Sequence, residues 1–179
     1  MKKIVKTITV AIVCLMTSVV FVFAQDNPKL SDAEVASVAV VANQIDIDYA
    51  EIAKKKSKNA EVLRFAETMA NDHKAVIGQA VALVKKLGVT PLDNAVSKKL
   101  VADADKTKKV LQSTAKGNFD KAYIDNEVAY HEAVIGAVEN LLIPESENAE
   151  LKALLVNVLP ALKTHLEHAK MVQKNFAAK

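Results

Sequence analysis

Apolar residues recur every three or four positions through nearly all of the chain after residue 30, and this period is the feature that most constrains the fold. In the stretch 59–87 the apolar positions are Val62, Ala66, Met69, Val76, Ala80, Val84 and Leu87. A period near 3.6 places such residues on one face of an amphipathic α-helix. The 179 residues include only four Gly and four Pro, and the turn-rich pattern of β-proteins is absent. We therefore expect an all-α protein.

Capping residues and helix breakers divide this pattern into five predicted helices. The first begins with a capping box, in which the side chains of Ser31 and Glu34 each satisfy a backbone N–H group of the other residue. Gly88 stops the second helix, and Asn118 or Asp120 is expected to cap the fourth. The predicted helices cover, approximately and in order, residues 31–58, 59–87, 94–115, 118–142 and 147–176.

Four of these helices are long, and the third is shorter with a thin apolar face. Short connections favour antiparallel neighbours, whereas about thirty residues separate the second helix from the fourth, and the third fills that gap as a crossover. Pro160 lies inside the fifth helix and should kink it, because it removes one backbone hydrogen bond. The sequence therefore predicts an up-and-down four-helix bundle with a short additional crossover helix. No repeat or low-complexity tract divides residues 25–179, so we expect them to form a single domain.

The first 24 residues have the features of a secretory signal peptide. Lys2, Lys3 and Lys6 precede an apolar run, and small residues suit cleavage near Ala24. A retained N-terminal membrane anchor is the alternative, because the apolar run is long for a signal peptide. Cleavage would leave no integral membrane domain and would export the chain to the periplasm or to an association with the outer membrane.

Cleavage would also change the charge and the cysteine content. Cys14 is the only cysteine, so the mature chain would have neither a disulfide nor a thiolate ligand. The net charge of +3 would fall to zero, because three of the 24 basic residues lie in the signal and 21 acidic residues remain. The charge of the precursor is therefore no reason to expect a nucleic-acid partner, and no residue pattern identifies a protein partner.

Three of the predicted helices carry a histidine within their apolar stripe: His73, His131 and His165. Imidazoles that point inward from three helices could meet at one level of a bundle, and neutral imidazole is a common ligand of Zn, Cu and Fe. Asp46 of the first helix could supply a fourth ligand. Glu127, one turn before His131, could ligate the metal or act as an outer acceptor that orients the ring.

The alternative is that these histidines are core residues whose nitrogens bond to neighbouring groups. The protein would then be a non-enzymatic structural or stress-related envelope protein. Enzyme signatures are scarce, because the chain contains no P-loop, no His-Glu-x-x-His and no Glu-x-x-His of the di-iron bundles. A redox or oxygenase enzyme on the same ligands is a third option, and it would need an open coordination position and a substrate channel.

Four segments resemble an exported bacterial family known as domain of unknown function 4142: "VLRFAETMANDHKAV", "LGVTP", "GNFDKAYIDNEVAYHEAVI" and "LPALKTHLEHA". The resemblance covers about residues 30–175. It implies a ferritin-like four-helix bundle and three shared histidine positions, here His73, His131 and His165. It also implies an acid in the first helix, for which Asp46 is the match where relatives tend to have Glu. It implies no established reaction.

Overall fold

The computed structural model describes residues 29–177, so the predicted signal peptide lies outside the described residues and its cleavage stays a prediction. The five main helices are α1 (Asp32–Lys56), α2 (Ala60–Leu87), α3 (Ala95–Ser113), α4 (Lys116–Ala137) and α6 (Ala149–Ala177). A π-helical turn, η1 (Val138–Leu142), and the short α5 (Ile143–Glu145) join α4 to α6. No strand occurs between residues 29 and 177, and the predicted all-α class is confirmed.

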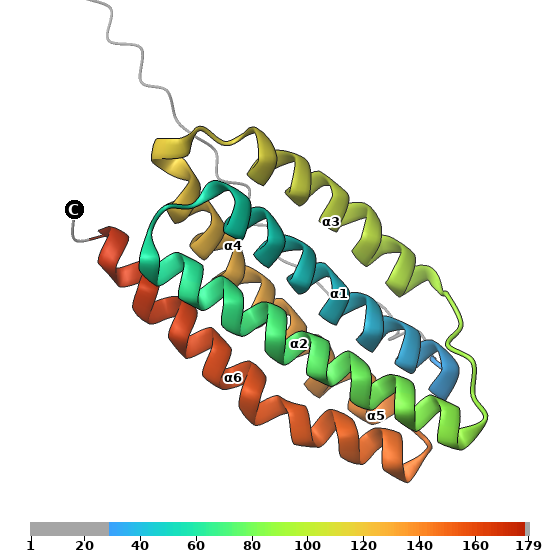
Figure 1. Ribbon diagram of the computed structural model, residues 1–179. Coiled ribbons are helices and arrows are strands. Elements are labelled where there is room, and N and C mark those ends of the chain that lie inside the picture. Colours follow the sequence, from blue (N-terminus) through green and yellow to red (C-terminus); the bar gives the residue numbers. More distant parts are fainter. Residues whose placement is uncertain (1–28, 178–179) are drawn as a thin grey trace, which may run out of the picture.

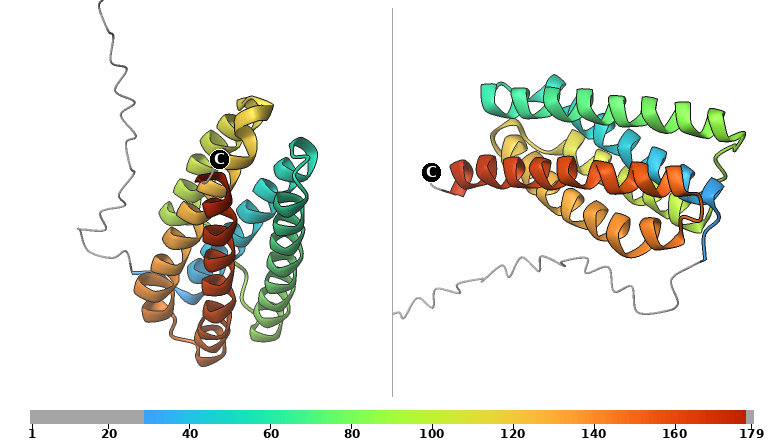
Figure 2. Two further views of the ribbon diagram at one scale, coloured as in Figure 1. Left: turned by 90° about the vertical axis from the view of Figure 1, so that its left-hand side faces the viewer. Right: turned by 90° about the horizontal axis from the view of Figure 1, so that it is seen from below.

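The long helices α1, α2, α4 and α6 form a four-helix bundle (Figure 1). α1 packs mainly on α2, α4 packs mainly on α6, and smaller contacts between α2 and α6 and between α1 and α4 complete the ring. Each main helix runs antiparallel to the one before it, so α2 and α4 point in the same direction. α3 makes this possible, because it returns along the outside of α1 (Figures 1 and 2). The predicted bundle with a crossover helix is confirmed.

Local sequence signals account for most helix ends. The capping box at α1 is present: the Glu34 N–H donates to the Ser31 hydroxyl, and the Ser31 N–H donates to the Glu34 carboxylate. The Asn59 side chain accepts from two N–H groups in the first turn of α2. Gly88 ends α2 with φ at 66°, a left-handed conformation that glycine adopts without strain.

The start of α4 differs from the prediction. Neither Asn118 nor Asp120 is the N-cap, because the helix begins at Lys116 after Ala115, whose side chain cannot accept a capping bond. Packing of the first turn outweighs capping here, since Phe119 is completely buried in the core. At the far end of the chain α6 continues on both sides of Pro160, and the bend expected there stays a prediction.

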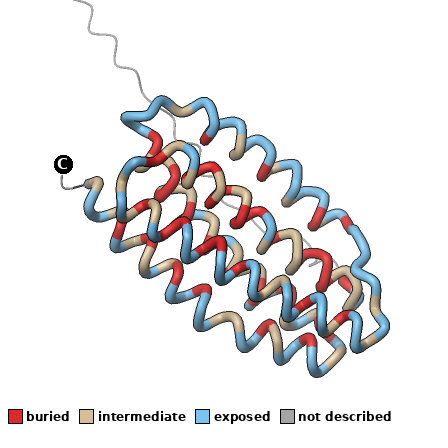
Figure 3. The backbone as a smooth tube through the Cα atoms, in the orientation of Figure 1, coloured by how far each residue is buried: buried red, intermediate tan, exposed pale blue. Residues whose placement is uncertain are grey.

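The core of the bundle has two parts, which we call the closed half and the open half. In the closed half all four long helices contribute buried residues, among them Ile45, Phe65, Met69, Tyr123 and Val172. In the open half the buried residues come from the start of α1, the end of α4 with η1, and the start of α6: Leu30, Val35, Val38, Ile135, Val138, Leu141, Leu142, Leu151, Leu155 and Leu162. α2 supplies none of them. Figure 3 shows the buried positions along the inner faces of the helices. Among the described helices, none is both long and apolar enough to cross a membrane.

Candidate metal site

The three predicted histidines meet between the two halves of the core. His73 comes from α2, His131 from α4 and His165 from α6, and their exposed fractions are 4%, 1% and 6%. The ring centroids lie 5.3–5.7 Å apart. One ring nitrogen of each histidine lies within 4.8 Å of one nitrogen of each of the others. The structure therefore brings these side chains together at one level of the bundle.

Each histidine ring is held by one hydrogen bond on its outer side. His73 donates from Nδ1 to the side-chain oxygen of Asn43 at 2.7 Å, and His165 donates from Nε2 to the carboxylate of Asp72 at 2.9 Å. His131 donates from Nδ1 to the main-chain oxygen of Glu127 at 3.0 Å. A neutral imidazole has one N–H, so these bonds fix which nitrogen keeps a lone pair.

The other nitrogen of each ring has no hydrogen-bond partner among the described residues. These nitrogens are Nε2 of His73, Nε2 of His131 and Nδ1 of His165, and all three are buried. A buried polar group without a partner destabilises a fold by roughly 1–3 kcal/mol. Three unpartnered acceptors gathered from three helices are therefore unusual for a purely structural core, and they have the chemistry of a metal ligand set.

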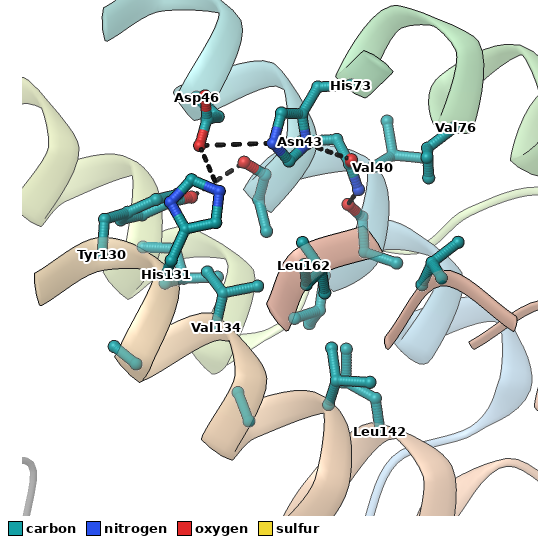
Figure 4. Close-up of a pocket in the computed structure, with 18 of the residues that line it drawn as sticks. Val40, Asn43, Asp46, His73, Val76, Tyr130, His131, Val134, Leu142 and Leu162 are labelled. Atoms are coloured by element: carbon teal, nitrogen blue, oxygen red, sulfur yellow. Dashed lines mark hydrogen bonds and ion pairs between the residues drawn. The ribbon is translucent and has the colours of Figure 1, made fainter. Parts of the chain in front are cut away.

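Asp46 and Glu127 lie beside the histidines, and both are completely buried. Asp46 Oδ2 lies 3.4 Å from His73 Nε2 and 3.6 Å from His131 Nε2, as Figure 4 shows. Glu127 Oε2 lies 3.7 Å from His131 Nδ1. These distances exceed the usual 2.7–3.2 Å of a hydrogen bond, and within residues 29–177 none of the four carboxyl oxygens has a neighbour in hydrogen-bond geometry. Asp46, Glu127 and His131 form a second group whose potential ligand atoms lie within 4.8 Å of one another.

Burial sets the protonation of these groups. Burial raises the pKa of Asp46 to about 8, and it raises the pKa of Glu127 well above its usual value, with the charge of Asp46 adding to that shift. Burial lowers the pKa of His73 to about 3 and the pKa of His131 to about 4. At neutral pH these two imidazoles are therefore uncharged, which is the form that binds metals, and Asp46 carries a proton that a cation could displace.

Sequence reasoning missed the residues that orient the rings. Asn43 lies one turn before Asp46 on α1, and Asp72 directly precedes His73, so both are adjacent to predicted positions. The available signal was a polar side chain within one helical turn of a predicted ligand, because such a side chain can reach the same site. The fourth histidine, His168, lies outside the group and packs edge-on against Phe65, with ring centroids 5.1 Å apart.

Comparison with known proteins places the chain in a family. Comparison with the curated proteins gave no match. Among solved structures, CopM in the Cu(II)-bound form is similar, with a TM-score of 0.60 and 20% sequence identity, over 82% of this chain and 98% of that chain. At this identity the likeness shows the fold. The family described as "Domain of unknown function (DUF4142)" matches residues 22–172, and the chain belongs to that family.

Proposed function

We propose that the protein is an exported metal-binding bundle that holds one transition-metal ion. His73, His131 and His165 would supply three ligands and Asp46 the fourth, with Glu127 as a further carboxylate beside His131. The observation that carries the proposal is the buried group of three histidines, in which one ring nitrogen of each lies within 4.8 Å of one nitrogen of each of the others. Each ring also has one buried nitrogen with no hydrogen-bond partner among the described residues.

The residues present fit such an ion. Metal–imidazole bonds of about 2.0–2.1 Å place the nitrogens of a tetrahedral site about 3.3 Å apart, so nitrogens within 4.8 Å need only small side-chain movements. Asn43, Asp72 and the carbonyl of Glu127 already hold the rings in the required tautomers. Loss of the Asp46 proton would provide one negative charge against the cation.

Two arguments favour Cu(II) over Zn or Fe. Affinity for a site of nitrogen and oxygen ligands rises from Fe²⁺ to Cu²⁺ and falls again at Zn²⁺. In addition, the similarly folded CopM was solved with Cu(II) bound. Zn(II) is the second choice, because it accepts a tetrahedral set of imidazole and carboxylate ligands.

Metal titration of the purified, chelator-treated protein tests the proposal. We expect one equivalent of Cu(II) to bind, and the electron paramagnetic resonance spectrum to show nitrogen coupling from imidazole ligands. His73→Ala and His131→Ala should abolish stoichiometric uptake, whereas His168→Ala, which removes a histidine outside the group, should retain it. Unchanged copper content in both ligand variants would refute the proposal and favour the structural alternative, in which the histidines only pair within the core.

Export is tested separately, because it depends on residues 1–24. We expect the protein isolated from the cell envelope of the expressing bacterium to have a mass that begins at Gln25. An envelope-bound protein that retains residue 1 would instead support the membrane-anchor alternative.

A further inference from the structure

A large apolar cavity extends from the histidines into the open half of the bundle (Figure 4). Its volume is about 1670 Å³, above the roughly 300–1,000 Å³ of common small-molecule sites. Asn43, Asp46, His73 and His131 lie at its polar end. The remaining walls are mostly apolar and include Val40, Val76, Val134, Leu142, Leu155, Val158 and Leu162.

Small side chains and the position of α2 account for this cavity. Past His73, α2 faces the bundle with the short side chains of Val76, Ala80 and Val84. Ala80 and Val84 are buried, but neither joins the contiguous cluster of the open half, against which α2 packs only the partly buried Leu83. On the opposite wall α4 presents small residues, including Gly136 and Ala137.

The cavity reaches solvent between α2 and α6. Ala75 and Gln79 of α2 and Ala161 of α6 line it, and all three residues are exposed. A molecule could therefore enter between these helices and extend inward to the histidines without crossing the closed half. The site has an apolar body and a polar end. Exposed residues of α3 and α4, including Lys106 and Glu132, also line it, so it meets solvent on more than one side.

We propose that this cavity binds a neutral single-chain amphipath whose head group donates a hydrogen bond, such as a long-chain alcohol. The apolar walls suit the chain. At the inner end, His73 Nε2, His131 Nε2 and His165 Nδ1 are buried nitrogens with no hydrogen-bond partner among the described residues. The Asp46 carboxyl oxygen lies 3.4 and 3.6 Å from the first two, beyond the usual hydrogen-bond length, so a donor on a bound head group would bond to them better. An anionic head would lose its hydration in this mostly apolar site, which disfavours a fatty acid carboxylate.

The inference does not rest on the proposed metal function, and it is tested on metal-free protein because an ion would use the same nitrogens. The probe is N-phenyl-1-naphthylamine, a neutral aromatic amine with one N–H donor, whose fluorescence rises in an apolar site. We expect saturable binding of one probe per chain. Hexadecan-1-ol should displace it, and hexadecanoate should displace it roughly tenfold less well, because a buried unpaired charge is strongly disfavoured.

Cavity-filling variants locate the binding. Ala80→Phe on α2 and Ala137→Phe on α4 should each weaken probe binding at least about tenfold, because the new ring occupies space that the probe needs. Val81→Phe is the matched control, since Val81 is 52% exposed and does not line the cavity. Circular dichroism and a thermal melt check the fold of each variant, and if one filling variant does not fold, the other decides.

Three outcomes would overturn the inference: no saturable binding to the wild type, undiminished binding in a folded filling variant, or equal displacement by the alcohol and the carboxylate. A copper titration of the same proteins separates the two proposals. Wild-type protein that takes up copper but does not bind the probe would refute the cavity ligand alone. Protein that binds the probe but takes up no copper would refute the metal site alone.

Discussion

The closed and open halves of the bundle contain the same four long helices but differ in what α2 contributes. In the closed half α2 supplies Val62, Phe65 and Met69, each with no exposed surface, and the four helices interlock. In the open half α2 supplies only the smaller buried side chains of Ala80 and Val84, neither of which joins the contiguous cluster there, and both line the large cavity. One end of the bundle therefore holds the helices together, while the other leaves room between them.

The histidine group lies at the boundary, and this position combines two requirements. The closed half fixes the helix positions that set the distances between His73, His131 and His165. The cavity of the open half is lined by all three histidines and by Asp46, and it connects them to solvent. Glu127 does not line that cavity. A site that must be both preorganised and accessible is expected at such a junction.

The largest effect should follow from breaking the closed half. Phe65→Ala removes a completely buried ring that packs against Tyr123 and His168. We expect a loss of about 3–5 kcal/mol in the free energy of unfolding, since the surrounding helices cannot collapse into the space. Urea denaturation of the metal-free protein measures this loss. A loss below about 1 kcal/mol would contradict the view that this half carries the stability.

Metal binding should stabilise the junction by a smaller amount. An ion that binds only the folded chain shifts the unfolding equilibrium toward that chain. Free Cu(II) at 100 times its dissociation constant should therefore raise the free energy of unfolding by about 2.7 kcal/mol. Denaturation with and without copper provides the measurement. The rise should vanish in His131→Ala, since His131 belongs to both groups of potential ligands, and should persist in His168→Ala. A rise that survives in His131→Ala would place the bound ion elsewhere.

The buried carboxyl groups predict a pH dependence in the metal-free protein. The pKa of Asp46 is about 8 when folded against an ordinary value of 3.8, and the pKa of Glu127 is also raised. Between the ordinary and the raised pKa values the folded chain therefore binds more protons than the unfolded chain, and its stability falls as the pH rises through this range. The lowered pKa values of His73 and His131 act in the opposite direction below about 6.5, so the fall should be clearest from pH 6.5 to 8.

We expect this fall to amount to roughly 2–4 kcal/mol over these 1.5 pH units, since each of the two carboxyl protons corresponds to about 1.4 kcal/mol per pH unit. Urea denaturation at pH 6.5, 7.25 and 8 follows it. The double variant Asp46→Asn/Glu127→Gln keeps the side-chain shapes and removes both titrating groups, so its stability should vary much less over the same range. Equal slopes in the wild type and the double variant would show that these carboxyl groups are already ionised in the folded protein.

The sequence predicted the helices and the inward positions of the five candidate ligands, because both follow from position along one helix, whereas metal binding by these residues stays a prediction. A residue at a buried point of a 3.6-residue period faces the core wherever the neighbouring helices lie. The roles of Asn43 and Asp72 depend on how far one helix is shifted along another, and a periodic pattern carries no information about that shift.

The cavity was missed for a related reason. Small residues such as Ala80 and Ala137 usually mark places where helices pack closely, and only the position of α2 shows that these two border open space. The cap of α4 was wrong because the burial of Phe119 outweighed the capping preference.

The smallest effect tests the difference between the halves on one helix with one kind of substitution. Val62 and Val84 both lie on α2, but Val62 is completely buried in the closed half, whereas Val84 is 9% exposed and lines the cavity. Val62→Ala should lower the free energy of unfolding by roughly 2 kcal/mol. This loss combines the burial free energy of the two removed methyl groups with the cost of the cavity that they leave. Val84→Ala should lower it by about 1 kcal/mol less, because its methyl groups border existing space and leave fewer contacts behind. Urea denaturation of the two metal-free variants measures the difference. Equal losses would mean that α2 is packed as tightly beside the cavity as in the closed half. The two halves would then not differ in how tightly α2 packs.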